Sequence, residues 1–458
     1  MLEIFLAILY FFTRLQNLTK LPVFADEAIY IRWSQIIKSV ETLRFIPLTD
    51  GKQPFFMWLT VPFFKIFQDP LFASRFVSVM AGFGTLIAIY LIVRHLTNKN
   101  IALISCLIYI LLPFSFFFDR MALADNLLSM FAVWALYLSL LLIKYPRYDL
   151  SMLLGIILGL AWLTKSPAIY FIVLSFATII YKQPKKYYLP IISVIFAFVI
   201  YNILRLGPQF HMIAIRNKDY IWPLSEILKH PLDPLKPHLI DIFNIYKLYI
   251  SIPILLLFFT KFNLILFAWY LLPLIATCAM AKVFTARYML FSLPPLIIIF
   301  SLALNKIKNK FIWLLLAIFF IPNIIFIYKL SLDPYHQKLT STEAGYINGW
   351  TSGWGIKESA DYLITQSKTK NVIVGTEGYF GTLPDGLQIY TNNIPNLTVF
   401  GVGLGLSQIP EKLLDAKAHG DDVYLLINDN RHTITGNFEI IKTFTKSDGQ
   451  KLMLYRLL

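Results

Sequence analysis

Two adjacent carboxylates, Asp26 and Glu27, lie in the stretch VFADEAIYIRW, directly after the first apolar segment of the chain. A carboxylate can act as a general base that removes a proton from a hydroxyl nucleophile. A structural interpretation is also available, because residues 28–43 have helical apolar periodicity: Asp26 would cap this helix and Glu27 would favour its dipole. The apolar face of such a helix suits the headgroup plane of a membrane. We expect Asp26 to cap the helix and to take part in chemistry.

Three basic residues could bind an anion. Lys52 precedes Pro54 in DGKQPFFMWL, where a helix that begins at Pro54 would join its N-terminus to an ammonium group in one phosphate site. Arg287, in FTARYMLFSLPPL, has a planar guanidinium that suits phosphate. Snorkelling of Lys52 and interfacial anchoring of Arg287 beside Tyr288 are the alternatives. Lys165, in LTKSPA, is a further possible anion ligand, although a structural role is favoured there.

A third group of charges, Asp119, Arg120 and Asp125, lies in FFFDRMALADNLL between two apolar segments. Charges next to hydrocarbon are usually paired, functional or both. An ion pair between Arg120 and Asp125 that braces the turn is favoured slightly over direct catalysis. The three residues are therefore expected to support the site.

The sequence shows no pattern typical of a metal centre or an activated nucleophile. His211, His230 and His238 lack metal-ligand spacing and are expected to be solvated loop residues. Cys106 and Cys278 both fall within apolar segments and are expected to be small core residues. No phosphate-cradling glycine loop or nucleophile elbow is visible.

The elements that position these residues are mostly membrane-spanning helices. The chain has 458 residues, of which 57% are hydrophobic, and its mean hydropathy is +0.64, which excludes an ordinary soluble protein. We expect about 11–13 transmembrane helices. The run 54–67 is too broken for a confident span. The predicted spans are 2–15, 71–96, 100–117, 123–144, 150–164, 167–181, 188–206, 242–260, 263–280, 286–304 and 311–330.

Charge distribution predicts the sidedness of these spans. The net charge of +15 belongs to the membrane part, so it does not indicate nucleic-acid binding. Lys and Arg dominate five short loops that alternate to one side, which is therefore cytoplasmic. The loops lie around residues 94–100, 144–149, 182–187, 261 and 306–310. The first outer loop (16–53), the outer loop 207–241 and the C-terminal part then face the extracytoplasmic side.

Hydropathy falls after residue 330, which predicts two domains: a transmembrane domain over 1–330 and a small α/β domain over 331–458. NVIVG, LTVFGV and DVYLLIN have the composition of buried strands. The last segment, FEIIKTFTKSDGQKLMLYRL, is typical of a hairpin with its turn at Ser447, Asp448 and Gly449. A Gly/Trp loop, GYINGWTSGWG, leads into a helix. We expect this domain to be extracytoplasmic.

Taken in order, five motifs resemble those of GT-C-type membrane glycosyltransferases, which use polyprenyl-phosphate-linked sugars. The motifs are ADEAIY, GKQPFFMWL with ASRFVSVMAG after it, DRMALADNLL, GLAWLTKSPA and ARYMLFSLPPL. The protein O-mannosyltransferases and the lipid A aminoarabinose transferases are the most similar groups, and the resemblance runs to about residue 300. It implies that Asp26 and Glu27 serve the acceptor and that Lys52 and Arg287 hold the donor phosphate. Gln53 departs from the pattern, since many relatives have a second proline there.

The resemblance predicts transfer of a sugar from a polyprenyl phosphate to a hydroxyl of a protein, glycan or lipid at the outer face. Asp26 would be the base, Glu27 would orient the acceptor or the loop, and the cations would stabilise the leaving phosphate. One base without a carboxylate nucleophile implies inversion. We expect no required cofactor or metal, although two acids could recruit a divalent ion. A transporter or flippase is the main alternative, and a receptor-like scaffold is a weaker one.

Overall fold

The computed structural model describes residues 1–250, 263–305 and 309–458, and these form two compact units that we describe separately. The helical unit comprises Met1–Gln16, Val40–Leu59 and Arg75–Lys329. The sheet unit comprises Asn17–Ser39, Thr60–Ser74 and Leu330–Leu458. This division differs from the predicted boundary at residue 330, because two segments of the N-terminal part pack with the C-terminal sheet.

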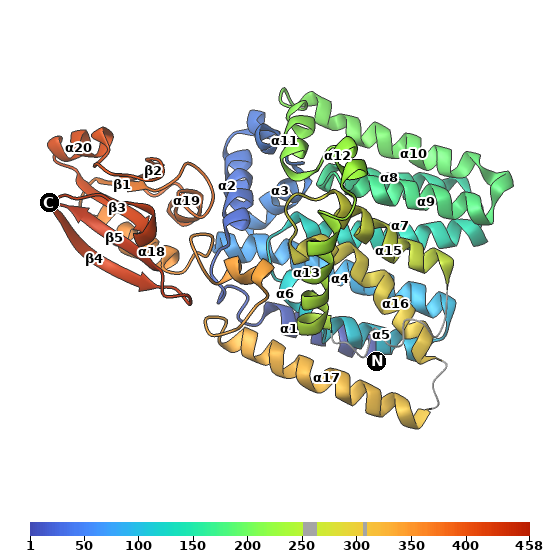
Figure 1. The fold of residues 1–458 in the computed structure, drawn as a ribbon. Coiled ribbons are helices and arrows are strands. Elements are labelled where there is room, and N and C mark those ends of the chain that lie inside the picture. Colours follow the sequence, from blue (N-terminus) through green and yellow to red (C-terminus); the bar gives the residue numbers. More distant parts are fainter. Residues whose placement is uncertain (251–262, 306–308) are drawn as a thin grey trace. The chain divides into compact units, whose positions relative to one another are not determined.

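The helical unit consists of apolar helices, as the sequence predicts (Figure 1). Among the described residues, four helices are long and apolar enough to cross a membrane: Pro70–Leu96, Ala124–Lys144, Tyr188–Leu206 and Ala286–Leu304. The chain is thus an integral membrane protein. The main helices are α1 (Leu2–Leu15), α4 (Pro70–Leu96), α5 (Lys99–Ile110), α6 (Pro113–Phe118), α7 (Ala124–Lys144), α8 (Tyr148–Thr164), α9 (Ala168–Lys182), α10 (Tyr188–Tyr201), α15 (Leu264–Met280), α16 (Leu293–Leu304) and α17 (Asn309–Leu332).

A proline accounts for one place where the helices depart from the predicted spans. The predicted span 100–117 is two helices, because Leu112 is extended immediately before Pro113, as the proline ring requires. The run 54–67 contains only α3 (Phe55–Thr60) and a 3₁₀ helix, η3 (Val61–Lys65). These elements are too short to cross a membrane.

The predicted outer loop 207–241 contains α11 (Met212–Tyr220), α12 (Leu224–Lys229) and the start of α13 (Leu235–Ile245). A short π-helix, η6 (Tyr246–Ile250), follows α13. The rest of the predicted span 242–260 and the predicted cytoplasmic positions 261 and 306–308 lie outside the described residues.

The sheet unit has five strands in the order β2-β1-β3-β5-β4 (Figure 1). Parallel pairs join β1 (Val372–Thr376) to β2 (Leu397–Gly401) and to β3 (Asp422–Asn428). The predicted hairpin is confirmed as β4 (Phe438–Thr445) and β5 (Lys451–Leu457), which pair antiparallel. Alternate residues of β1 and β3 point to opposite faces. One face packs on α18 (Ile356–Ser367) and α19 (Asp385–Thr391), and the other packs on α20 (Glu411–Ala418).

The first-loop helix α2 (Ala25–Ser39) belongs to the sheet unit. Its residues Ala28 and Ile31 are fully buried in the same core as Leu387 of α19. The Gln35 side chain also donates a hydrogen bond of 2.8 Å to the Ile389 carbonyl. Ala28, Ile31 and Gln35 lie on a different side of α2 from the predicted apolar face, so this packing does not test the predicted placement of that face in the headgroup plane. The helix predicted over residues 28–43 ends at Ser39.

Candidate functional site

The acidic pair lies at the start of α2, where the two carboxylates have different environments. Glu27 is fully buried, and its Oε2 accepts a hydrogen bond of 3.0 Å from the Phe24 backbone N–H. This contact is one half of a capping box, so Glu27 caps the helix. The predicted capping role of Asp26 is wrong, since the helix already begins at Ala25. Asp26 is partly exposed.

Backbone contacts to the Gly/Trp loop fix the start of α2 within the sheet unit. The Ala25 N–H donates to the Thr351 carbonyl at 3.1 Å, and Phe24 forms a β-bridge with Ser352. Asp26 therefore follows a segment that is held by residues more than 300 positions later in the chain. This long-range support positions the proposed base.

Lys52 lies in a small charge network of the helical unit. Its Nζ is 3.1 Å from Asp50 Oδ2. The other oxygen of Asp50 accepts two hydrogen bonds from Arg216, at 2.9 Å from Nε and 2.5 Å from Nη2. The hydrogen bond to Asp50 raises the pKa of Arg216 above its ordinary value. Asp50 thus holds both cations in place.

Packing of the first loop determines where Lys52 lies. Leu48 is fully buried in a cluster with Leu163 of α8 and Ile213 of α11. Gly51 has φ +67°, and a Cβ there would lie 2.7 Å from Arg216 Cβ, so only glycine permits this approach. The predicted helix start is one residue early, because Pro54 precedes α3. Since α3 has only six residues, its dipole contributes little to a phosphate site.

Two further predicted cations meet at one aromatic ring. Lys165 Nζ lies 4.7 Å and Arg287 Cζ lies 5.7 Å from the centroid of the Tyr288 ring. Lys165 also donates a 2.5 Å hydrogen bond to Asp125 Oδ1. The second oxygen of Asp125 is buried and has no hydrogen-bond partner among the described residues. This ion pair is compatible with the favoured structural role of Lys165.

Hydrogen bonds between elements join these residues into one cluster. Ser129, one turn after Asp125 on α7, donates to the Leu290 carbonyl at 3.0 Å and so holds η8 (Ala286–Ser292), which carries Arg287. Gln53 donates to Ser166 Oγ at 2.7 Å, which links the first loop to the turn after α8. We call this set the basic cluster: Lys52, Lys165, Arg216 and Arg287 with Asp50, Asp125 and Tyr288.

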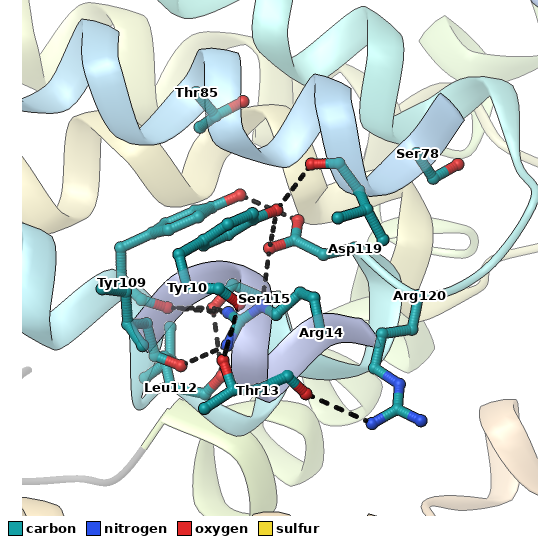
Figure 2. A network of polar contacts seen from close by, with 12 residues as sticks. Tyr10, Thr13, Arg14, Ser78, Thr85, Tyr109, Leu112, Ser115, Asp119 and Arg120 are labelled. Atoms are coloured by element: carbon teal, nitrogen blue, oxygen red, sulfur yellow. Dashed lines mark hydrogen bonds and ion pairs between the residues drawn. The ribbon is translucent and has the colours of Figure 1, made fainter. Parts of the chain in front are cut away.

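Asp119 belongs to a different network, buried among α1, α4, α5 and α6 (Figure 2). Its carboxylate is 3.2 Å from Arg14 Nε, and both side chains are fully buried. It also accepts hydrogen bonds of 2.8 Å from Tyr109 and 3.2 Å from Tyr10. Gly82 of α4 leaves room for the group, since a Cβ there would lie 2.5 Å from the carboxyl carbon. This geometry gives Asp119 a structural role.

The predicted ion pair between Arg120 and Asp125 is wrong, because the carboxylate pairs with Lys165 instead. The Arg120 guanidinium lies 4.7 Å from the Phe116 ring and donates a 3.5 Å hydrogen bond to the Thr13 carbonyl. Asp125 thus belongs to the basic cluster, and Arg120 lies beside the Asp119 network.

Three functional or structural residues were missed by sequence reasoning. Arg14 is a charge inside the apolar run LEIFLAILYFFTRL, which is the signal that could have identified it. Asp50 lies two positions before Lys52 in the same motif, and Arg216 lies in α11 without a motif. His238 was misassigned: it is buried, and its Nδ1 is 2.8 Å from the Cys278 carbonyl.

Within residues 1–250, 263–305 and 309–458, no group of three or more His, Cys, Asp or Glu side chains could hold a metal ion. The basic cluster contains four cations and two carboxylates, so its net charge is positive. An anionic group of the size of a phosphate is the ligand that such a set favours.

Comparison with known proteins agrees with this chemistry. Residues 51–204 match the family described as dolichyl-phosphate-mannose-protein mannosyltransferase, and this range contains Lys52, Asp125 and Lys165. No curated protein matches the sequence of the chain.

Solved structures share the fold along nearly the whole chain. ArnT from Cupriavidus metallidurans, bound to undecaprenyl phosphate, has a TM-score of 0.62 at 14% identity over 99% of this chain and 97% of that one. Its apo state has a TM-score of 0.61 at 11% identity with the same coverage. The Archaeoglobus fulgidus oligosaccharyltransferase, in complex with Zn and sulfate, has a TM-score of 0.54 at 13% identity over 93% of this chain and 68% of that one. The chain therefore shares the fold of these structures, and its residues 51–204 match the mannosyltransferase family model.

Proposed function

We propose that the protein transfers a sugar from a polyprenyl-phosphate donor to a hydroxyl group of a protein, glycan or lipid at the outer face of the membrane. The basic cluster of the helical unit would bind the donor phosphate. The observation that carries this proposal is the convergence of Lys165 and Arg287 on Tyr288, with Lys52 linked to them through Gln53 and Ser166. The matched family and ArnT bound to undecaprenyl phosphate support a lipid-phosphate donor.

The cations would act when the bond between the sugar and the phosphate breaks. Departure of the lipid phosphate develops negative charge on its oxygens, and preorganised cations stabilise that charge most in a partly dry site. Asp125 and Asp50 hold Lys165 and Arg216 in fixed positions before the donor binds. The buried second oxygen of Asp125 could accept a hydrogen bond from a hydroxyl or amino group of the donor sugar.

The acceptor hydroxyl is a poor nucleophile until it loses its proton, and we assign that step to Asp26. The Asp26 residue is partly exposed. Glu27 is proposed as a positioning residue, because its carboxylate is occupied by the Phe24 N–H. The oxygen of the acceptor would attack the anomeric carbon as the phosphate leaves, which inverts the configuration. We propose that no metal is required, because Lys and Arg balance the charge of the phosphate.

The test is sugar transfer in proteoliposomes with a panel of polyprenyl-phosphate sugars and hydroxyl acceptors. Wild-type protein should release free polyprenyl phosphate from at least one donor, with a product of inverted configuration. Asp26→Asn should lower turnover about 10²–10⁴-fold while donor binding is retained. The matched control is Glu358→Gln, which changes an exposed acid of the same unit.

Two outcomes would contradict the proposal. If Asp26→Asn keeps activity within a few-fold of wild type, Asp26 is not the base. If no donor is consumed and labelled lipid crosses the bilayer instead, the protein is a flippase for a lipid-linked substrate.

A further inference from the structure

The sheet unit contains a second polar site at the carboxyl ends of β1 and β3. These strands are neighbours in the sheet, and the chain leaves them in opposite directions, from β1 toward β2 and from β3 toward β4. In open α/β sheets, ligands bind in the crevice at such a switch in strand order. Glu377 directly follows β1, and Asn428 is the last residue of β3.

Charged and amide groups converge at this place. Glu377 is buried, and its carboxylate accepts hydrogen bonds from the Asn428 side chain at 2.6 Å and the Asn428 backbone at 3.2 Å. Arg431 Nε lies 3.8 Å from the same carboxylate. Within the described residues, Arg431 Nη1 and Asn428 Oδ1 are buried without a hydrogen-bond partner. The site therefore has one unused donor and one unused acceptor, which is unusual for buried groups.

One aromatic ring lies against these groups, and two more are exposed in the loop after β1. The Trp350 ring lies 4.4 Å from the centre of the Arg431 guanidinium and is 45% exposed. In the loop after β1, Tyr379 and Phe380 are 73% and 66% exposed. Gly381, in the same loop, is close to Trp350, since a Cβ there would lie 3.8 Å from the ring. Exposed aromatic side chains next to unsatisfied polar groups are a feature of binding surfaces.

Hydrogen bonds from Lys446 and to Asp448 hold the loop that carries Trp350. Lys446 is buried, and its ammonium group donates hydrogen bonds to the Gly349 carbonyl at 2.7 Å and to the Ser352 carbonyl at 3.0 Å. The Gly349 N–H in turn donates to Asp448 at 2.9 Å. The loop that carries Trp350 is thus held on both sides of the ring.

We propose that this site binds a saccharide that forms part of the acceptor, an inference that rests on the proposed sugar transfer. The apolar C–H face of a sugar ring fits an exposed aromatic platform. Neighbouring hydroxyls, each a donor and an acceptor, match the unused groups of Arg431 and Asn428. Because residues 351 and 352 also contact the start of α2, the site and Asp26 lie on the same unit and share the Gly/Trp loop.

The experiment uses the full-length protein in nanodiscs with labelled mannose, glucose and galactose trisaccharides as probes. Wild type should bind at least one of them, and Trp350→Ala and Arg431→Gln should each weaken that binding tenfold or more. Trp350→Phe should restore most of the affinity. The control is Leu414→Ala, which removes an apolar side chain of the same unit with a similar exposure of 47%.

Kinetics separate this inference from the proposed function. With the bound trisaccharide as acceptor, Trp350→Ala should raise KM tenfold or more and change kcat less than threefold. The inference is overturned if wild type binds none of the probes, or if both variants bind as wild type does while donor turnover proceeds normally. Failure of the proposed function would instead appear as no release of polyprenyl phosphate from any donor, whatever the saccharide binding.

Discussion

The helical unit contains two carboxylates that a single sequence motif places six residues apart, Asp119 and Asp125, and they have different environments. Asp119 pairs with Arg14 where both side chains are 0% exposed, and two tyrosines complete its hydrogen bonds. Asp125 is 6% exposed and pairs with Lys165, which is 24% exposed, in a cluster with excess positive charge. The two sites contain the same types of residue. The balance of charge and the exposure to solvent distinguish the structural Arg14–Asp119 pair from the proposed substrate site around Lys165 and Asp125.

The largest expected effect on stability comes from breaking the buried pair. Asp119→Ala leaves the Arg14 charge without its partner, which should cost about 3–5 kcal/mol of unfolding free energy. The double variant Arg14→Met/Asp119→Leu should recover most of this loss, because apolar groups of similar volume often replace a buried pair without penalty. Thermal unfolding in detergent measures both.

The control for this prediction is the exposed pair Arg147–Asp149, whose removal should change unfolding little. Activity per folded molecule should be unchanged in the double variant. A large activity loss there, with normal unfolding, would give Asp119 a role in the reaction and remove the contrast with Asp125.

In the basic cluster, substitutions are expected to lower donor turnover strongly and to change stability less. Lys165→Met and Arg287→Met should each lower donor turnover about 10²–10³-fold, because each removes a group that stabilises the leaving phosphate. The free energy of unfolding should fall less than in Asp119→Ala, since Lys165 is 24% exposed and Arg287 is partly exposed, so that water screens the remaining charge. Parallel measurements of release of polyprenyl phosphate and of thermal unfolding test both statements.

Lys99→Met, which removes an exposed cation of the same unit, is the matched control and should keep wild-type turnover. If Lys165→Met unfolds as readily as Asp119→Ala, the Lys165–Asp125 pair is structural as well, and the comparison fails.

The carboxyl of Asp385, in the sheet unit, should make the stability of the protein depend on pH. Burial raises the pKa of Asp385 from 3.8 to about 6, although its Oδ2 accepts a 2.6 Å hydrogen bond from Gly381. A raised carboxyl pKa stabilises the folded state fully below pH 3.8, and this contribution is lost as the pH rises through about 6. Asp385→Asn should therefore unfold with a free energy higher by on the order of 2 kcal/mol at pH 7.5.

Near pH 4 the variant and wild type should unfold alike, because Asp385 is then largely protonated. Thermal unfolding of both proteins between pH 4 and pH 8 measures the difference. A constant difference over this range would mean that the substitution acts through packing and not through the charge.

Removal of divalent metal should have the smallest effect. Since Lys and Arg balance the charge of the phosphate in the proposed reaction, turnover after treatment with EDTA should stay within twofold of the untreated enzyme. If EDTA abolishes activity and added Mg²⁺, Mn²⁺ or Zn²⁺ restores it, the proposal is contradicted. The acidic residues would then be candidate metal ligands.

Local patterns in the sequence predicted much of the fold. The strands and the closing hairpin are confirmed, because their apolar residues follow a period that a short window reveals. The break before Pro113 is also a local effect, although the predicted span ignored it. Four of the predicted residues, Lys52, Asp125, Lys165 and Arg287, lie in one cluster, since each ends or begins an apolar segment.

Long-range pairing could not be predicted in the same way. Arg14 and Asp119 are 105 positions apart, and neither motif indicates the other. The packing of α2 on α19 joins residues 354 positions apart, as the bond from Gln35 to Ile389 shows. The amphipathic pattern of a helix predicts that its apolar face is covered. It does not indicate whether lipid or protein covers that face.

The sheet unit is assembled from the two ends of the chain, and this has a consequence for biosynthesis. Ala28 and Ile31 of α2 leave the ribosome long before Leu387, the side chain that buries them, has been made. Such contacts of high sequence separation form late and slowly. During synthesis the first loop must therefore remain soluble, or be held by a chaperone, until the last strands are complete. Removal of residues 331–458 would uncover Ala28 and Ile31 of α2 and make the remaining protein prone to aggregation.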